Sequence, residues 1–352
     1  MSKSIFVSRE AADRRERTFA LAILLAGSIG IILPLLYMAG QSLSSKQVIK
    51  TIPSSIIPIE GKRVTIDSLG VPGRQYFVYK VEVDGVEREL AYVDKQDRMW
   101  VYVDPENPTE KILQPPASPD SRVAAVVLNW QNYAEALTRS PFSRYVVNTL
   151  FILVISTFGT VLSTTFVAYG FSRFYFRGRG FLFLILLSTM MLPPQVSLIP
   201  SFVIFQKIGW YDTYLPLIVP SFFAVSAWNV FLMRQFLMGL PVELDDAAKI
   251  DGCGPVRTLA HVILPQSVPV LITITLFSGV FWWNDYFYSL IYLQDKLKFT
   301  VALGLQSFDS LYFNNNALKA AATTMIMTPP IVIFFFFQRY FIQGTVVSGV
   351  KG

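Results

Sequence analysis

Few residues in this chain of 352 have the types and spacing that chemistry requires. A single cysteine, Cys253, cannot close an internal disulfide, and a single histidine, His261, excludes a multi-histidine metal site. No Gly-x-x-x-x-Gly-Lys-Ser/Thr sequence is present to cradle the phosphates of a nucleotide. We interpret Cys253 and His261 as packing residues. The sequence thus predicts no catalytic residue, no metal and no cofactor of its own, and we expect the chain not to be an enzyme.

The most informative polar pattern lies at 240–265, between two apolar runs. Pro241 suits the first turn of a helix. Three acids follow where negative charge complements the helix dipole, namely Glu243, Asp245 and Asp246. Gly252 and Gly254 end this helix, and Pro255 starts a second one. The pattern predicts a helix–turn–helix in which Ala247 and Ala248 form a small-residue face against which another protein can pack closely.

The elements that position this segment are long apolar runs. Apolar residues make up 53% of the chain, charged residues only 15%, and the mean hydropathy is +0.46. About 20 apolar helical residues cross a bilayer. Six segments qualify, and the only charge within them is Asp285: 19–41, 145–170, 181–204, 215–233, 268–291 and 320–337. This composition excludes a soluble globular protein, a disordered chain and a disulfide scaffold.

The distribution of lysine and arginine predicts the orientation of these spans. Segments 1–18, 171–180, 234–267 and 338–352 together carry 13 basic residues, whereas the short loops 205–214 and 292–319 carry 4. Short cytoplasmic loops are enriched in basic residues, so we expect both termini on the inner side. The apolar run of about 23 residues in the first segment exceeds a typical signal-peptide core, which favours a retained span over cleavage. No basic stretch resembles a nucleic-acid surface.

Residues 44–125 differ from the rest of the chain, because charged residues are frequent there. Alternation of apolar and polar residues over 77–83 predicts a strand, and Asp84-Gly85 predicts a hairpin turn. A returning strand is expected over 86–93 and a third over 99–103. We interpret this stretch as a small β-rich module outside the membrane, serving as a spacer or cap, or else as a docking surface.

The segment 240–265 resembles the cytoplasmic loop of ABC-importer membrane subunits, whose pattern is Glu-Ala-Ala, three residues, Gly, nine residues, Ile, any residue, Leu-Pro. Here Asp246-Ala247-Ala248 is followed by Gly252 and then by Val262-Ile263-Leu264-Pro265, with the spacing intact. Aspartate for glutamate and valine for isoleucine are conservative departures. The resemblance implies a permease subunit of an ATP-driven importer in a bacterial or archaeal cytoplasmic membrane.

Further stretches resemble one branch of that family, the carbohydrate importers, and in particular the smaller membrane subunit of the maltose system. They are Trp130-Gln-Asn-Tyr133, Pro141 to Asn148, Leu192-Pro-Pro-Gln-Val-Ser-Leu-Ile-Pro200, Trp283-Asn-Asp285 and Gln338 to Gly344. The resemblance covers about 1–43 and 126–352 and leaves out 44–125. It implies an all-α integral membrane protein of six transmembrane helices, with both termini inside and a β-rich extracytoplasmic insertion between spans one and two.

We therefore expect three parts. Residues 1–43 form the cytoplasmic N-terminus and the first helix, 44–125 the insertion, and 126–352 a five-helix permease core with the coupling loop 240–266 and a cytoplasmic tail. The resemblance implies partner ATP-binding subunits that hold ATP and Mg, a second homologous permease subunit, an extracytoplasmic solute-binding protein and membrane lipid, with no nucleic acid. The ATPase-coupling residues it implies are Glu243, Asp246, Ala247, Ala248, Asp251, Gly252, Arg257, Leu264 and Pro265.

Three further groups of residues are candidates for a role in translocation. Asp285 is the lone charge in a span, accompanied by aromatic and amide groups in Trp283, Asn284 and Tyr288. These four either contact sugar in the pore or pack structurally, and for Asp285 we favour pairing with a neighbouring helix. The prolines Pro193, Pro194 and Pro200 either form a gate region or simply kink span three. The tail residues Gly344, Lys351 and Gly352 are expected to contact the ATPase subunits.

Other functions remain open alternatives. A stand-alone secondary transporter commonly shows repeats and several intramembrane charges, whereas only Asp285 is available here. A membrane sensor lacks room for a signalling domain, and a membrane enzyme lacks a catalytic set. Within ABC permeases, importers of glycerol phosphodiesters share much of the same signature, so the solute is not fixed by the sequence.

Overall fold

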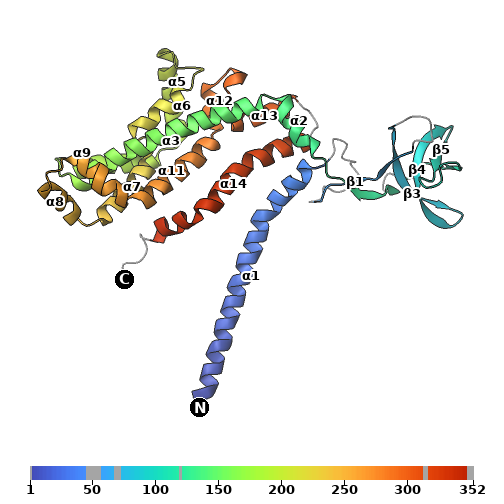
Figure 1. The fold of residues 1–352 in the computed structure, drawn as a ribbon, viewed down its shortest axis with the longest axis horizontal. Coiled ribbons are helices and arrows are strands. Elements are labelled where there is room, and N and C mark those ends of the chain that lie inside the picture. The colour runs from blue at the N-terminus through green and yellow to red at the C-terminus, as the bar shows by residue number, and fades with distance from the viewer. Residues whose placement is uncertain (1, 45–56, 67–72, 119–120, 312–315, 347–352) are drawn as a thin grey trace. The chain divides into compact units, whose positions relative to one another are not determined.

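The computed structural model describes residues 2–44, 57–66, 73–118, 121–311 and 316–346 (Figure 1). The chain divides into two compact units. The first unit comprises residues 1–136 and 314–324, and the second comprises 137–313 and 325–352. The last helix, α14 (Asn316–Val346), contributes to both.

The first unit begins with the apolar helix α1 (Ser2–Ser42), whose end is fastened to the short helix α2 (Gln131–Arg139). The buried Asn132 side chain donates hydrogen bonds to the carbonyls of Ser42 at 2.8 Å and Ser44 at 2.7 Å. The hydroxyls of Ser42 and Tyr133 lie 2.6 Å apart. These contacts fix the point at which α1 ends.

Between these helices the chain forms two antiparallel sheets. The small sheet pairs β1 (Ile59–Gly61) with β7 (Ala124–Val126). The larger sheet has the order β2-β3-β4-β5-β6. Its strands are β2 (Arg63–Thr65), β3 (Gln75–Val83), β4 (Val86–Gln96), β5 (Met99–Val103) and β6 (Lys111–Gln114).

The sheet has strands in the three places where the sequence predicts them. Asp84 and Gly85 both adopt positive φ, at 54° and 76°, as a two-residue turn between β3 and β4 requires. The returning strand runs to Gln96, three residues beyond the predicted end. Tyr79, Val81, Val83, Leu90 and Tyr102, which belong to β3, β4 and β5, form a buried cluster on one face of this sheet.

The second unit is helical. Its elements are α3 (Phe142–Arg173), α4 (Arg179–Ser188), η3 (Thr189–Met191), α5 (Pro194–Lys207), α6 (Leu215–Ile218), η4 (Val219–Phe223), α7 (Ala227–Gly239), α8 (Glu243–Ile250), α9 (Pro255–Thr258), η5 (Leu259–Ile263), α10 (Leu264–Gln266), α11 (Val268–Trp283), α12 (Phe287–Tyr292), η6 (Lys296–Lys298), α13 (Val301–Leu311) and the later part of α14.

Helix α3 is central to this unit and packs against both α7 and α11 (Figure 1). Small residues on α3 allow neighbouring backbone to approach, as is typical of helix packing in membranes. Ser156 and Ser163 donate hydrogen bonds to the carbonyls of Leu217 and Ser221 at 3.2 and 2.9 Å. A side chain at Gly159 would place its Cβ 2.7 Å from the Phe222 ring.

Four helices are long and apolar enough to cross a membrane: Glu16–Ser42, Phe142–Arg173, Leu215–Gly239 and Asn316–Gln338. Two further pairs qualify if each bent pair is one span. They are Arg179–Met191 with Pro194–Lys207, bent by 98°, and Pro255–Gln266 with Val268–Trp283, bent by 84°. These candidates overlap all six predicted segments.

Two of the predicted segments are less regular than an uninterrupted helix. The segment 268–291 breaks after Trp283, and α12 begins at Phe287 after three intervening residues. The segment 215–233 breaks at Ala224, whose φ is +52°, and α7 then extends to Gly239. Hydropathy detects length and composition, but these breaks depend on side-chain hydrogen bonds and packing that a hydropathy window does not contain.

Candidate functional site

The predicted coupling loop forms a short helix followed by a second, bent helical segment. Helix α8 spans Glu243–Ile250, with all three acids in its first turn as expected from the helix dipole. It starts two residues after Pro241. The second segment comprises α9, the π-helical turn η5 and α10, which lead into α11 at Val268. A π-helical turn inside a helix is uncommon and frequently marks a functional position.

Gly252 ends α8 by a specific geometry. Its φ is +75°, which a residue with a side chain rarely adopts. The N–H of Gly252 bonds to the carbonyl of Lys249 at 3.0 Å, and the N–H of Cys253 bonds to the carbonyl of Ala248 at 2.9 Å. This pair of bonds is the Schellman arrangement, in which a left-handed residue satisfies the last carbonyls of a helix. The glycine is therefore required by the turn itself.

A buried ion pair fastens α8 to the end of α3. The Arg173 Nε atom lies 3.1 Å from Asp245 Oδ2, and the two side chains are only 9% and 10% exposed. Arg173 also donates from Nη2 to the carbonyl of Leu240 at 3.1 Å. The Tyr169 hydroxyl donates to the carbonyl of Pro255 at 3.3 Å. The last turn of α3 thus holds the loop at both of its helical segments.

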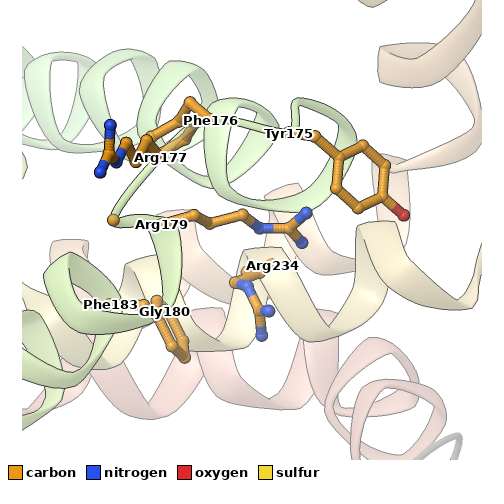
Figure 2. A pocket seen from close by; sticks show the side chains of 8 residues that line it. Tyr175, Phe176, Arg177, Arg179, Gly180, Phe183 and Arg234 are labelled. Atoms are coloured by element: carbon orange, nitrogen blue, oxygen red, sulfur yellow. The ribbon is translucent and has the colours of Figure 1, made fainter.

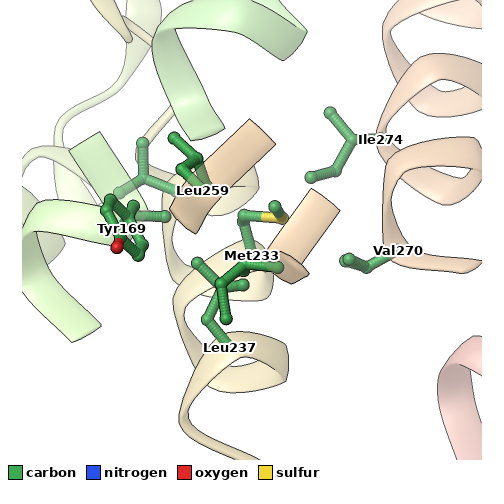
Figure 3. Packing of buried hydrophobic residues seen from close by; sticks show 9 residues of the cluster. Tyr169, Met233, Leu237, Leu259, Val270 and Ile274 are labelled. Atoms are coloured by element: carbon green, nitrogen blue, oxygen red, sulfur yellow. The ribbon is translucent and has the colours of Figure 1, made fainter. Parts of the chain in front are cut away.

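The second half of the loop is fastened by apolar packing. Leu259 and Ile263 from η5 are buried with residues from three helices, α3, α7 and α11 (Figure 3). The remaining members of the cluster are Ala168, Tyr169, Val230, Met233, Leu237, Val270 and Ile274. Because protein interiors are close-packed, a displacement of this segment has to displace the helices that surround it. The loop is built as an extension of the helical bundle.

The outer side of the loop is exposed and carries both charged and apolar groups. Glu243, Asp246, Ala247, Asp251 and Arg257 are exposed. Lys249 pairs with Asp246 of its own helix at 3.0 Å, with both side chains largely exposed. Among large apolar side chains here, Ile250 is 87% exposed, Val256 68% and Val242 58%. Exposed apolar groups together with a rim of charges are typical of a protein-binding surface.

The two alanines that we predicted to form one packing surface point in different directions. Ala247 is exposed, but Ala248 is only 4% exposed and faces its own chain. The expectation that both present one surface to a partner does not agree with this geometry, because successive helical residues point about a quarter of a turn apart. Leu264 is half-buried and Pro265 exposed where η5 passes into α10.

Sequence reasoning missed several residues of this site. Arg173 and Tyr169 lie about 70 residues from the loop they hold, and nothing in the local pattern connects them with it. Asp245 was assigned only to the helix dipole. A signal did exist for Ile250, which stands between Lys249 and Asp251 in a polar segment with no apolar run to belong to.

The second candidate group lies at the break between α11 and α12. The Asp285 carboxylate accepts hydrogen bonds from the backbone N–H groups of Tyr288 at 3.2 Å and Ser289 at 3.0 Å, and from the Ser289 hydroxyl at 2.8 Å. It therefore caps the first turn of α12. Asp285 is 7% exposed. This arrangement supports a structural role. The partners lie in α12, which directly follows Asp285, and not in a packed neighbouring helix as we expected.

The residues beside Asp285 do not form one polar surface. Trp283 is buried, and its Nε1–H donates to the carbonyl of Ile326 at 2.9 Å. Asn284 is exposed and donates to the carbonyl of Val280 at 2.8 Å. Tyr288 is half-buried and packs with Phe281 and Phe287. Of the four, Asn284 presents the most accessible polar side chain.

The remaining predicted positions are distributed along the chain. Pro193 and Pro194 lie at the 98° bend that precedes α5, whereas Pro200 lies inside α5 without interrupting it. Gly344 lies near the end of α14, and Lys351 and Gly352 lie outside the described residues. Within the described ranges, no group of three or more His, Cys, Asp or Glu side chains could hold a metal ion.

Comparison with known proteins identifies the relatives of this fold. Residues 161–347, which include the whole coupling loop, match the family described as the binding-protein-dependent transport system inner membrane component. A probable ABC transporter permease protein, YurM of Bacillus subtilis, is 32% identical over 63% of this chain and 74% of its own length. The arabinooligosaccharides transport system permease protein AraQ of the same species is 33% identical over 64% of this chain and 80% of its own.

A solved structure shares the fold at low sequence identity. It is described as a bacterial ABC transporter involved in the import of the acidic polysaccharide alginate, and its matching chain is 19% identical with a TM-score of 0.65. The match covers 94% of this chain and 98% of that one.

Proposed function

Because the chain belongs to the family of binding-protein-dependent transport system inner membrane components, we propose that its loop 240–266 is the element through which a separate ATPase drives transport. The chain is a multi-pass protein of the cytoplasmic membrane and the permease subunit of an ATP-driven importer. Its own part in transport is mechanical. It receives a movement at the loop and passes it to the helices that form the pathway.

The observation that carries this proposal is the two-sided construction of the loop. One side is fastened to α3 by the Arg173–Asp245 pair and to α7 and α11 by Leu259 and Ile263. The other side exposes Ile250 and Val256 among charges. A partner bound to the exposed side can therefore move the bundle, provided that it contacts the loop differently in its two states.

We further propose six spans with both termini inside, each bent helix pair serving as one span. The charge distribution supports this, with 13 basic residues on the loop side and 4 in the short loops of the opposite side. Residues 44–125 then lie outside the cytoplasm as a separate module, followed by the five-helix core 126–352. A reporter fused to the C-terminus that is active only outside the cell would contradict this topology.

The proposed cargo is a sugar or oligosaccharide that an extracytoplasmic binding protein delivers. The name of the AraQ relative supports this chemical class. A second homologous permease subunit completes the pathway, and ATP with Mg²⁺ binds to the partner ATPase, since this sequence has no phosphate-cradling motif. The C-terminal tail is a second proposed contact with the ATPase, and the bend at Pro193 and Pro194 a proposed gate.

Two experiments test these statements separately. Co-purification of the full chain with a soluble ATPase supports the importer assembly, whereas a lone chain that transports solute in liposomes would support a secondary transporter. Transport by the complete complex is then screened against oligosaccharides, glycerol phosphodiesters, amino acids and peptides. Uptake of oligosaccharides is the expected result, and uptake of only the other classes would overturn the proposed cargo.

A further inference from the structure

A pocket with a volume of about 590 Å³ lies where α4 begins, next to the end of α3 (Figure 2). Three arginines and three aromatic residues contribute most of its lining: Arg177, Arg179, Arg234, Tyr175, Phe176 and Phe183. It is separate from the exposed surface of the coupling loop described above. All of its charged residues are arginines, and arginine is the side chain best suited to bind a phosphate.

Two of the arginines are oriented by neutral groups. Arg234 donates from Nε to the carbonyl of Phe171 at 3.2 Å and lies 4.1 Å from the centre of the Phe183 ring. Arg179 donates to the carbonyls of Phe174 at 3.3 Å and Ser172 at 3.4 Å. Within the part of the chain that the structure describes, none of the three arginines forms an ion pair with a carboxylate. The orientation of Arg179 and Arg234 is thus fixed, and no described carboxylate compensates the charge of any of the three.

The backbone at this pocket also favours an anion. Gly178 adopts φ +86° and precedes the first turn of α4, where no side chain caps the helix and no acidic residue is present. The positive end of the helix dipole therefore adds to the field of the arginines. Figure 2 shows Arg177 on the far side of this turn from Arg234, so the arginines surround the turn and do not project to one side.

The surroundings of the pocket are apolar, which discriminates between candidate ligands. None of the residues of α4 is buried, and Phe181 and Leu184 are 67% and 60% exposed. Tyr175, at the rim, is 94% exposed. An acidic surface of a protein partner would meet this apolar helix unfavourably, whereas the acyl chains of a lipid would lie along it. Basic pockets between transmembrane helices on the cytoplasmic side are suited to anionic headgroups.

We propose that this pocket binds the phosphate of an anionic phospholipid in the membrane leaflet from which the coupling loop emerges. The phosphate lies against Arg179 and Arg234, Arg177 adds its charge from the far side of the turn, and the acyl chains lie along α4. The bound phosphate joins α4 to α7 and stabilises the turn that follows Arg173, the residue that anchors α8. This inference goes beyond the transport function, and only its assignment to the inner leaflet depends on the proposed topology.

The test measures lipid binding by the complete importer complex in detergent. Native mass spectrometry counts bound dioleoyl phosphatidylglycerol and, separately, dioleoyl phosphatidylcholine during titration. The variant carries Arg177→Gln and Arg179→Gln. The matched control carries Arg144→Gln and Lys207→Gln, which together remove two positive charges from exposed positions in α3 and α5. Arg177→Lys with Arg179→Lys tests whether charge alone is sufficient.

We expect phosphatidylglycerol to bind the wild type in preference to phosphatidylcholine. The glutamine variant should bind phosphatidylglycerol about tenfold more weakly or worse, since each basic residue near an anionic lipid surface contributes about 1 kcal/mol. The control and the lysine variant should retain most of the affinity. If the glutamine variant fails to assemble, the preference of the wild type between the two lipids still decides the proposal.

Three outcomes would overturn it. Equal binding of the two lipids by the wild type would remove the anionic selectivity. Displacement of phosphatidylglycerol by millimolar inorganic phosphate would assign the pocket to free phosphate. Binding that appears only after the ATPase is removed would assign the surface to that protein. Lipid binding is measured without transport, so its failure is distinguishable from failure of the proposed function.

Discussion

Two helix interruptions in this protein are each held by a buried aspartate, and the two aspartates are held in opposite ways. Asp285 is satisfied within the next four residues, by two N–H groups and a hydroxyl of α12. Asp245 pairs with Arg173, which lies in a different helix 72 residues earlier in the chain. A local cap preserves the shape of one break, whereas a long-range ion pair joins two elements that are far apart in the sequence. The first is suited to maintaining a bend and the second to transmitting a movement.

The largest effect is expected from breaking the long-range pair. Asp245→Ala leaves the Arg173 guanidinium buried without its partner, and losing one member of a buried pair typically costs about 3–5 kcal/mol. We expect a marked fall in the unfolding temperature of the purified complex and loss of transport. Asp246→Ala is the matched control, because Asp246 is exposed and pairs with Lys249, which is exposed as well. Equal unfolding temperatures for the two variants would contradict the anchoring role of Asp245.

A smaller effect is expected at the end of α8. Gly252→Ala forces a side chain into φ +75°, which costs about 1–2 kcal/mol, although the space beside Gly252 is empty. The strain should loosen the turn and lower the amount of substrate transported per ATP hydrolysed. Gly254→Ala, at φ −73°, is the control. An unchanged transport ratio in Gly252→Ala, with ATP hydrolysis still stimulated by substrate, would show that the turn is not required for coupling.

The exposed face should affect partner binding and leave folding unaffected. Ile250→Ser removes an apolar side chain that is 87% exposed. We expect unchanged unfolding of the isolated chain but weaker retention of the ATPase, by about 1–2 kcal/mol if Ile250 is a central contact. The control is Ile199→Ser, since Ile199 is 72% exposed on α5, away from the loop. Equal retention of the ATPase by both variants would assign the surface another role.

Substitutions of Asp285 test whether this residue caps α12 or contacts the substrate. Asn also caps helices but offers one acceptor oxygen where Asp285 uses two, so Asp285→Asn should lose part of the stability that Asp285→Ala loses, which is about 1 kcal/mol. Because the carboxylate oxygens are already occupied by α12, we expect substrate concentration dependence of transport to be unchanged in Asp285→Asn. A large loss of apparent substrate affinity in a normally assembled Asp285→Asn complex would instead assign Asp285 to the substrate pathway.

The smallest effect on stability is expected for a substitution of Asp212, on the opposite side of the bundle. Desolvation raises the pKa of this carboxyl, but the Lys298 ammonium and the N–H groups of Gln294 and Asp295 outweigh it, so the pKa lies below its ordinary value. Stability from a lowered carboxyl pKa is present above the unfolded-state pKa of about 3.9 and is lost as pH falls through the folded-state value.

Unfolding temperatures of the complex should therefore decline more steeply below about pH 4 in the wild type than in Asp212→Asn. Asn tolerates the positive φ of 54° at this position, so backbone strain does not obscure the comparison. Identical slopes in the wild type and in Asp212→Asn would show that this carboxyl does not contribute to the acid sensitivity.

Local features of the fold could be predicted from the sequence, and long-range ones could not. The bend at Pro193 follows from ring chemistry, the hairpin at Asp84-Gly85 from conformational preference, and the end of α8 from Gly252. Each depends on residues within one turn. The Arg173–Asp245 pair requires knowledge of which helices are neighbours, and so does the burial of Ala248. We expected Asp285 to pair with a neighbouring helix, but its hydrogen-bond partners lie in α12, the helix that directly follows it. The break that separates α11 from α12 is not detected by hydropathy.

The central claim is that α8 and α3 move together because Arg173 holds both Asp245 and the carbonyl of Leu240. Arg173→Lys tests it most directly, since it keeps the charge but loses the forked geometry that allows both contacts. The measurement is the amount of substrate transported per ATP hydrolysed by the assembled complex in liposomes. We predict normal assembly with a ratio that falls several-fold. A ratio equal to that of the wild type, in a complex of equal composition, would contradict the account.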